Sequence, residues 1–271
     1  MADGMVPIST GATMATGDGL KARKSLGQHW LVDNESLESI IELANISKSD
    51  TVLEIGPGTG NLTKLLTKAA NKVVGVELDN RLANHLKALN ISNLEIINQN
   101  ILEFNPDNLG TYKVVANIPY YLTGQLIKYI SELNNRPTLA VLLVQKEIAE
   151  RLAALPGQLS ILGLTCQYYW QVEKGPVILA DKFSPPPKVN SQIVKLTPKD
   201  TFLTKDKEQD LFKLIKIGFS EKRKTLANNL SRGYRLDKLA ARRLIESLNL
   251  RSDCRPQTLS LDDWLKLIDL L

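Results

Sequence analysis

Five short apolar segments recur along the first 145 residues, and stretches with helical spacing separate them. The apolar segments are residues 51–55, 72–77, 94–98, 114–117 and 139–144. They are rich in Val, Ile and Leu and are too short for helices, as is typical of strands buried in a parallel sheet. Helices are predicted through about residue 44, from about residue 61, and over residues 80–89 and 122–133. Strands alternating with helices predict an α/β, doubly wound fold.

Two later strands follow a pair of helices. Helices are predicted over residues 146–155 and 159–169, and strands over residues 172–178 and 188–196. Between these strands lies Phe183-Ser-Pro-Pro-Pro-Lys188, which holds too much proline for a helix. Two consecutive strands at the end of a parallel sheet predict an antiparallel edge. The complete prediction is a Rossmann-like, seven-stranded mixed sheet.

The pattern turns fully helical after residue 200. Apolar residues recur at intervals of three and four from Leu211 to Phe219, and further helices are predicted over residues 238–248 and from Ser260. Residues 201–271 hold 15 Lys and Arg against 10 Asp and Glu, whereas residues 1–200 hold 19 of each. The whole net charge of +5 therefore belongs to this segment. A basic end on a neutral body indicates a polyanionic partner, although solubility alone is an alternative explanation.

Composition limits the class of protein. Hydrophobic residues make up 43% and charged residues 23%, as in ordinary globular proteins. Two distant cysteines and two histidines are too few for a Cys/His zinc site, so no metal is expected, and the compartment is expected to be reducing and cytoplasmic. No apolar run is long enough for a membrane span. Residues 1–20 contain neither a secretory signal nor a transit peptide and are predicted to be a disordered leader.

A glycine turn follows the first predicted strand. Gly56, Gly58 and Gly60 let the backbone approach a ligand at the start of a helix. Their spacing differs from the GxGxxG fingerprint of NAD-binding folds. Glu54 just before the turn would repel a pyrophosphate and favour a cation, such as the sulfonium and amino groups of S-adenosylmethionine. A purely structural turn is the alternative reading.

Polar residues also end the next two strands. Glu77 lies 19 residues after Gly58, where nucleotide-binding folds place a carboxylate on ribose hydroxyls. Asp79 is predicted to cap the following helix. Asn100 follows the third strand, where its side chain could hydrogen-bond the edge of an adenine.

The end of the fourth strand carries the most specific chemistry. Asn117, Ile118, Pro119 and Tyr120 present a carboxamide, a carbonyl, a rigid turn and a flat ring at the carboxyl end of a strand. Two acceptors and a ring would suit the amino group of a planar base. On these residues alone, a proline turn with a half-buried tyrosine is an equal alternative.

These segments together resemble one family, the ribosomal RNA adenine dimethyltransferases, and within it the bacterial small-subunit (KsgA/RsmA) enzymes. The resemblance begins at residue 21 and covers nearly all of the chain after it. The matching motifs are residues 27–31 (GQHWL), 53–60 (LEIGPGTG), 76–79 (VELD), 117–120 (NIPY), 143–147 (LVQKE), 183–189 (FSPPPKV) and 223–226 (RKTL). Each motif alone is a weak to moderate signal, but all of them in this order are highly specific.

The resemblance implies an S-adenosylmethionine-dependent enzyme that dimethylates N6 of two adjacent adenosines in the 3′-terminal hairpin of small-subunit rRNA, late in 30S assembly. It implies a catalytic domain over residues 21–200, a helical RNA-binding domain over residues 201–271, and a monomer without membrane contact. The implied cofactor-binding residues are His29, Leu31, Gly56, Glu77, Asn100 and Asn117. The implied catalytic residues are Asn117, Pro119 and Tyr120, with Phe183 expected to cover the target base.

The chain departs from the family pattern at three positions. Trp30 stands where phenylalanine is usual, and Asn100 and Asn190 each replace an aspartate. The carbonyl of Asn100 can still accept a hydrogen bond from an adenine amine, but without charge assistance.

Three other functions are considered. A related methyltransferase that modifies one large-subunit adenosine shares the NIPY core, but residues 183–188 and 255–260 favour the small-subunit enzyme. A non-catalytic RNA-binding assembly factor is disfavoured by the intact glycine turn and NIPY motif. An NAD dehydrogenase is disfavoured by the glycine spacing and by Glu54.

Overall fold

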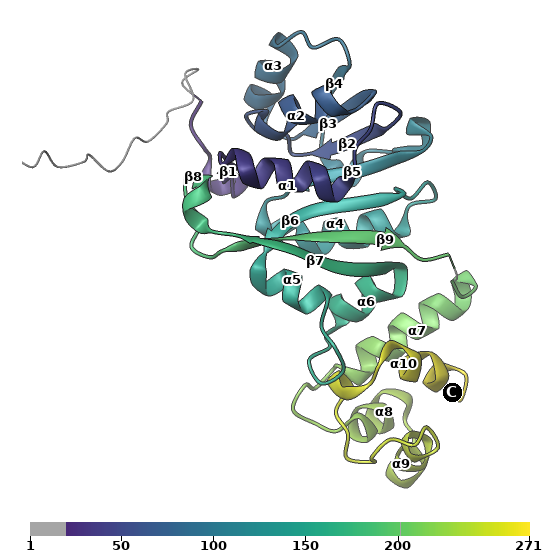
Figure 1. Ribbon diagram of the computed structural model, residues 1–271. Helices are drawn as coiled ribbons and strands as arrows, with labels where there is room; N and C mark the ends of the chain where they lie inside the picture. Colours follow the sequence, from purple (N-terminus) through teal and green to yellow (C-terminus); the bar gives the residue numbers. More distant parts are fainter. Residues whose placement is uncertain (1–19, 201) are drawn as a thin grey trace, which may run out of the picture.

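The computed structural model describes residues 20–200 and 202–271 (Figure 1). The leader predicted for residues 1–20 therefore falls outside the described part of the chain, apart from Leu20. The main sheet has seven strands in the order β4-β3-β2-β5-β6-β9-β7. The first five pair in parallel, and β9 pairs antiparallel with both β6 and β7. The predicted mixed sheet with an antiparallel edge is confirmed.

The strand bounds differ little from the prediction for the parallel part of the sheet. The strands are β2 (Thr51–Ile55), β3 (Lys72–Glu77), β4 (Leu94–Asn98), β5 (Tyr112–Asn117), β6 (Leu139–Gln145), β7 (Trp170–Ile178) and β9 (Ser191–Pro198). The predicted start of β9 at residue 188 is wrong, because the proline-rich loop extends to Asn190. A separate two-stranded sheet, β1 (Trp30–Leu31) with β8 (Phe183–Ser184), was not predicted.

Helices connect the strands and make up the C-terminal part. They are α1 (Asn34–Ala44), α2 (Asn61–Ala69), α3 (Asn80–Ala88), α4 (Thr123–Glu132), α5 (Lys146–Leu152), α6 (Ile161–Tyr169), α7 (Lys205–Gly218), α8 (Leu226–Tyr234), α9 (Lys238–Glu246) and α10 (Leu261–Ile268). The predicted cap at Asp79 is confirmed, because this side chain accepts a bond from a backbone N–H group of α3, and Asp33 caps α1 in the same way. Ser260 and Asp263 form a capping box at α10. None of the helices in the described residues is long and apolar enough to cross a bilayer.

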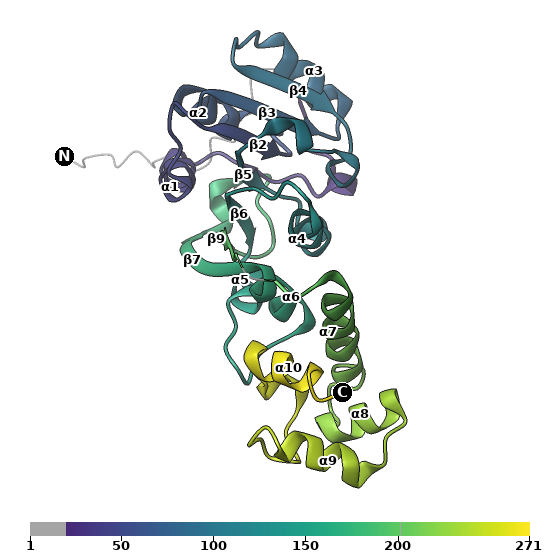
Figure 2. The same ribbon diagram turned by 90° about the vertical axis from the view of Figure 1, so that its right-hand side faces the viewer.

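Successive side chains along each strand point to opposite faces of the sheet, so the hydrophobic core has one part on each face. Val52, Val73 and Val115 belong to the cluster that includes the buried residues of α1 and α2. Their neighbours Leu53 and Val74 belong to the cluster that includes the apolar side of α4. Figure 2 shows α1 and α2 on one side of the sheet and α4 on the other. Helices on both faces keep the parallel strands out of water, as such strands require.

The C-terminal helices α7 to α10 lie beyond the β7 edge of the sheet (Figures 1 and 2). The rings of Tyr168 and Tyr169 at the end of α6 contact Phe202 and Phe212. These aromatic contacts join the helices to the sheet through a continuous hydrophobic cluster. β9 ends at Pro198 and α7 begins at Lys205, while the division into two domains near residue 200 stays a prediction.

A glycine at the end of α7 provides a test of packing in this helical part. A Cβ atom at Gly218 would lie 2.3 Å from the ring of Trp264, which is fully buried and cannot move aside. Gly218→Ala is therefore expected to cost about 1–3 kcal/mol of stability and to lower Tm by several degrees. The measurement is thermal unfolding followed by circular dichroism. Gly124→Ala in α4 is the matched control, because a Cβ atom there meets nothing within 4 Å, and its Tm should not fall. Equal Tm values for the two variants would contradict this packing.

Candidate functional site

One pocket lies where the carboxyl ends of β2, β3, β4 and β5 meet. This is the switch point of the strand order, where α/β sheets place ligands. All eight residues that the sequence analysis assigned to cofactor binding or catalysis line this pocket. They are His29, Leu31, Gly56, Glu77, Asn100, Asn117, Pro119 and Tyr120. The structure therefore gathers them into one place, while their individual roles stay predictions.

The glycine turn borders the pocket with backbone that carries no side chain. Gly56, Gly58 and Gly60 have φ angles of 66°, 62° and 84°, a region that favours glycine. A Cβ atom at Gly56 would meet nothing within 4 Å, so the backbone there borders free space. α2 begins directly after the turn at Asn61. A ligand can therefore contact this backbone without meeting side chains.

The carboxylate of Glu77 is held in place by backbone. One oxygen accepts a bond from the N–H of Gly58 at 3.0 Å, and the other from the N–H of Asp79 at 2.8 Å. Burial raises the pKa of Glu77, and these two bonds oppose that increase. Each carboxylate oxygen has a second lone pair that can accept a hydrogen bond from a ligand hydroxyl.

Glu54 is a buried acid behind the glycine turn. Its side chain is 1% exposed, and its Oε2 atom has no hydrogen-bond partner among the described residues. Burial raises the pKa of Glu54 to about 8, and the negative charge of Glu77 adds to this increase. The side chain of Thr63 acts in the opposite direction and lowers the pKa of Glu54. Such a group is most stable beside a positive charge, as the sequence indicated.

The amide of Asn117 has a fixed orientation. Its Nδ2 atom donates to the backbone carbonyl of His29 at 3.1 Å. Among the described residues no donor reaches its Oδ1 atom, which is left to accept a bond from a ligand. Asn117 ends β5, and Pro119 fixes the backbone that follows. The acceptor oxygen is therefore presented by a rigid turn.

Tyr120 is positioned from two sides. Its hydroxyl shares a 2.9 Å hydrogen bond with the hydroxyl of Ser191 on β9. The ring of His29 lies nearly parallel to the ring of Tyr120, with centroids 5.9 Å apart and planes 19° apart. The expected position of Phe183 over the target base is wrong: its side chain is 3% exposed and packs in the core opposite Leu31. Phe183 pairs with Leu31 across the small sheet, but only Leu31 lines the pocket.

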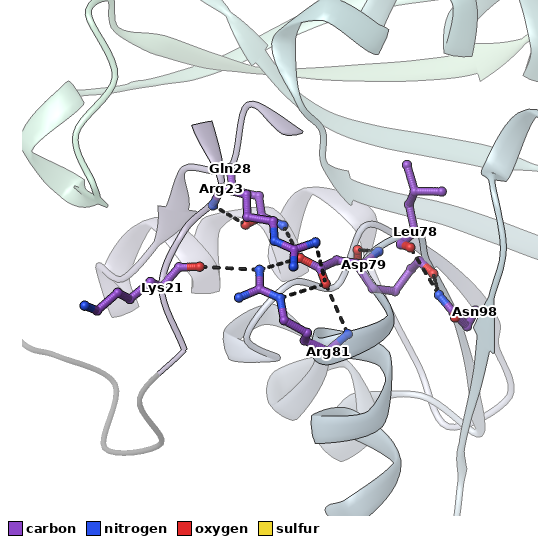
Figure 3. Close-up of polar contacts among 8 residues, drawn as sticks. Lys21, Arg23, Gln28, Leu78, Asp79, Arg81 and Asn98 are labelled. Carbon is purple, nitrogen blue, oxygen red and sulfur yellow. Dashed lines mark hydrogen bonds and ion pairs between the residues drawn. The ribbon is translucent and has the colours of Figure 1, made fainter. Parts of the chain in front are cut away.

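The N-terminal arm, residues 20–31, is fastened by Asp79 (Figure 3). Asp79 accepts bonds from Gln28 at 3.2 Å and from Arg81 at 2.7 Å, and it pairs with Arg23 at 3.8 Å. The hydrogen bond from Arg81 is the main reason that the pKa of Asp79 is lowered. The sequence predicted only the capping role of Asp79, because the arm lies 51 residues away from it along the chain.

Comparison with known proteins decides the family. The family model for ribosomal RNA adenine dimethylases matches residues 19–269. The chain belongs to the ribosomal RNA adenine dimethylase family. The resemblance found in the motifs is thereby confirmed, together with the class of enzyme, an rRNA adenine dimethyltransferase. An NAD dehydrogenase is excluded.

Several relatives of the chain within this family are named ribosomal RNA small subunit methyltransferase A. The relative from Dehalococcoides mccartyi strain CBDB1 is 38% identical over 94% of this chain and 90% of its own length. The relative from Nostoc sp. is 38% identical over 93% of this chain and 98% of its own length.

Two solved structures share the fold. A dimethyladenosine transferase from Plasmodium falciparum superposes with a TM-score of 0.74 at 32% identity, over 88% of this chain and 96% of its own. The 23S rRNA methyltransferase ErmE superposes with a TM-score of 0.72 at 25% identity, over 89% of this chain and 98% of its own.

Proposed function

We propose that this methyltransferase dimethylates N6 of two adjacent adenosines in the 3′-terminal hairpin of small-subunit rRNA, late in 30S assembly, with S-adenosylmethionine as cofactor. The observation that carries the proposal is the amide of Asn117, whose nitrogen is bound to the arm and whose oxygen is free beside Tyr120. The relatives named small subunit methyltransferase A support the choice of rRNA.

The pocket fits this cofactor. Glu77 would accept hydrogen bonds from the ribose hydroxyls, and Asn100 would contact the edge of the adenine. The backbone at Gly56, which has no side chain, would contact the part of the cofactor near its sulfur. The unpartnered, buried oxygen of Glu54 fits a positively charged ligand. The cofactor supplies a methyl group on a sulfonium, which needs no metal for transfer. His29 and Leu31 of the arm would close the pocket from the side.

The residues at the end of β5 would prepare the nucleophile. The lone pair of adenine N6 is delocalised into the ring, so this nitrogen is a poor nucleophile. The Asn117 Oδ1 atom and the Ile118 carbonyl oxygen would each accept a hydrogen bond from one N–H bond of this amino group. These two bonds would draw the nitrogen toward tetrahedral geometry. Tyr120 would stack on the base, worth about 1–3 kcal/mol, once the base has left its helix. Alignment then supplies most of the acceleration: the N–C bond forms as the S–C bond breaks, the cofactor leaves as a neutral thioether, and the proton lost by the methylated nitrogen passes to water without a strong general base.

The helical part would bind the RNA. Residues 201–271 carry the entire excess of positive charge, and Lys222, Arg223 and Lys224 lie between α7 and α8. Such a surface lowers the cost of approaching phosphates. We accordingly assign residues 21–200 to catalysis and residues 201–271 to RNA binding, in a cytoplasmic monomer that acts on pre-30S particles.

Methyl transfer to ribosomal particles tests this function. The protein is incubated with labelled S-adenosylmethionine and 30S particles that lack the two dimethyladenosines, and the labelled bases are mapped. The expected result is label on two adjacent adenosines near the 3′ end. Label in large-subunit RNA instead would indicate the ErmE-like activity. Binding of particles without any transfer would indicate a non-catalytic assembly factor.

The buried Glu54 gives a pH dependence. Because its pKa is about 8 in the folded protein, it is mostly protonated at neutral pH, and a bound cation favours its ionised form. The affinity for S-adenosylmethionine, measured by calorimetry, should therefore rise with pH up to the pKa, by at most about tenfold per pH unit. Glu54→Gln should remove this dependence, whereas Glu42→Gln on the exposed side of α1 should retain it. An unchanged profile in Glu54→Gln would refute the role.

Ionisation of Glu54 should also affect stability in the absence of ligand. The pKa rises from 4.5 to about 8 on folding, so the stabilisation by its proton is complete below pH 4.5 and is lost as pH rises through 8. Wild-type protein should therefore lose more stability than Glu54→Gln over this range, as urea unfolding at several pH values would show.

A further inference from the structure

The pocket contains a second buried polar group without a partner, besides Glu54. Only four buried side-chain polar atoms in the described residues lack a hydrogen bond: Trp30 Nε1, Glu54 Oε2, Thr63 Oγ1 and Trp264 Nε1. Trp30 and Glu54 both line the pocket. A buried donor without an acceptor is destabilising, so its presence in a residue that lines a pocket indicates that a ligand supplies the acceptor.

The indole of Trp30 is fixed against the glycine turn. A Cβ atom at Gly58 would lie 3.2 Å from its Nε1 atom and 3.0 Å from its Cδ1 atom. The edge of the ring that carries the N–H group therefore borders the turn. Trp30 pairs with Ser184 in the small sheet, and the next residue, Leu31, accepts a 2.9 Å bond from Asn61. The donor is thus held in place before any ligand binds.

The two unpartnered groups differ in kind. Glu54 Oε2 is an acceptor that favours a cation, and Trp30 Nε1 is a neutral donor. A ligand that satisfies both carries a cation and a hydrogen-bond acceptor, as an α-amino acid does with its ammonium and carboxylate groups. A neutral indole is also suited to a site for a sulfonium, because a Lys or Arg donor would repel that charge.

We infer that Trp30 Nε1 donates a hydrogen bond to the carboxylate of the cofactor's amino-acid end, while Glu54 faces its ammonium group. The inference rests on the proposed function for the identity of the cofactor. It gives the indole nitrogen of Trp30 a role in cofactor binding that phenylalanine could not fill.

Indole N–H signals in NMR spectra test this contact directly. The chain has three tryptophans, so three signals are expected, and Trp30→Phe assigns one of them. Trp170 Nε1 already donates to Ser131 at 2.7 Å, and Trp264 lies in α10, so both serve as internal references. S-adenosylmethionine should shift the Trp30 signal downfield. Methylthioadenosine lacks the amino-acid end and should therefore not cause this downfield shift of the Trp30 signal. An equal shift with both ligands would overturn the inference.

Calorimetry with the same two ligands gives the size of the effect. Trp30→Phe should bind S-adenosylmethionine about 10- to 100-fold more weakly than wild type and methylthioadenosine equally well, as for a lost bond to a charged group. Trp264→Phe removes the same kind of N–H group outside the pocket and should change neither affinity. Equal loss for both ligands, or no loss, would refute the role of the indole N–H. If wild type binds neither ligand, the proposed cofactor itself is wrong.

Discussion

Asn117→Ala is expected to slow methyl transfer by about 10²- to 10³-fold in single turnovers with undermethylated 30S particles. The side-chain oxygen is the acceptor that would hold N6 of the base, and alanine leaves that nitrogen unoriented. Affinity for S-adenosylmethionine should fall by no more than about tenfold, because Glu77, Asn100 and the glycine turn remain. Quenched-flow measurement of label transfer separates the two effects.

The control for this substitution is Asn61→Ala. Asn61 also donates its side-chain nitrogen to a carbonyl of the arm, that of Leu31 at 2.9 Å, as Asn117 does to His29 at 3.1 Å. If Asn117 acts through its oxygen on the base, Asn61→Ala should be much faster than Asn117→Ala. Similar rates for the two variants would mean that Asn117 only anchors the arm.

Glu77→Gln is expected to weaken cofactor binding by about 10- to 100-fold. Both carboxylate oxygens accept backbone N–H bonds, so an NH₂ group in either position opposes another donor. The substitution also removes the charge that strengthens bonds from ribose hydroxyls. Calorimetry is the measurement, and Glu42→Gln is again the surface control.

The ligand dependence distinguishes Glu77 from Trp30. Because Glu77 would contact the ribose, Glu77→Gln should lose affinity for methylthioadenosine as well as for S-adenosylmethionine. A loss confined to S-adenosylmethionine would place Glu77 at the amino-acid end and would contradict the assignment. Thermal unfolding of the variant shows whether the fold is retained.

The parallel strands could be predicted from the sequence because their signal is local. Segments such as 73–77 and 140–144 are continuous runs of buried residues, and Gly56 and Asn117 mark where two strands end. Rules for open α/β sheets then place those ends together. Gly56, Glu77, Asn100 and Asn117 could be placed at one pocket in this way, whereas His29 and Leu31 were assigned through the resemblance to the family, and Phe183 does not line the pocket.

Long-range contacts could not be predicted in the same way. The β1–β8 pair has two residues on each side, too few for a recognisable pattern, and its partners lie more than 150 residues apart. The inward orientation of Phe183 and the bond between Tyr120 and Ser191 depend on that pairing and on β9. The free N–H group of Trp30 appears only when the packing around Gly58 is known.

A structure of the protein with an S-adenosylmethionine analogue and an undermethylated 30S particle would test the central claim most directly. We expect an unstacked adenosine whose N6 group donates hydrogen bonds to Asn117 Oδ1 and to the Ile118 carbonyl, with Tyr120 against the ring. An adenosine bound elsewhere, with Asn117 still joined only to His29, would contradict it.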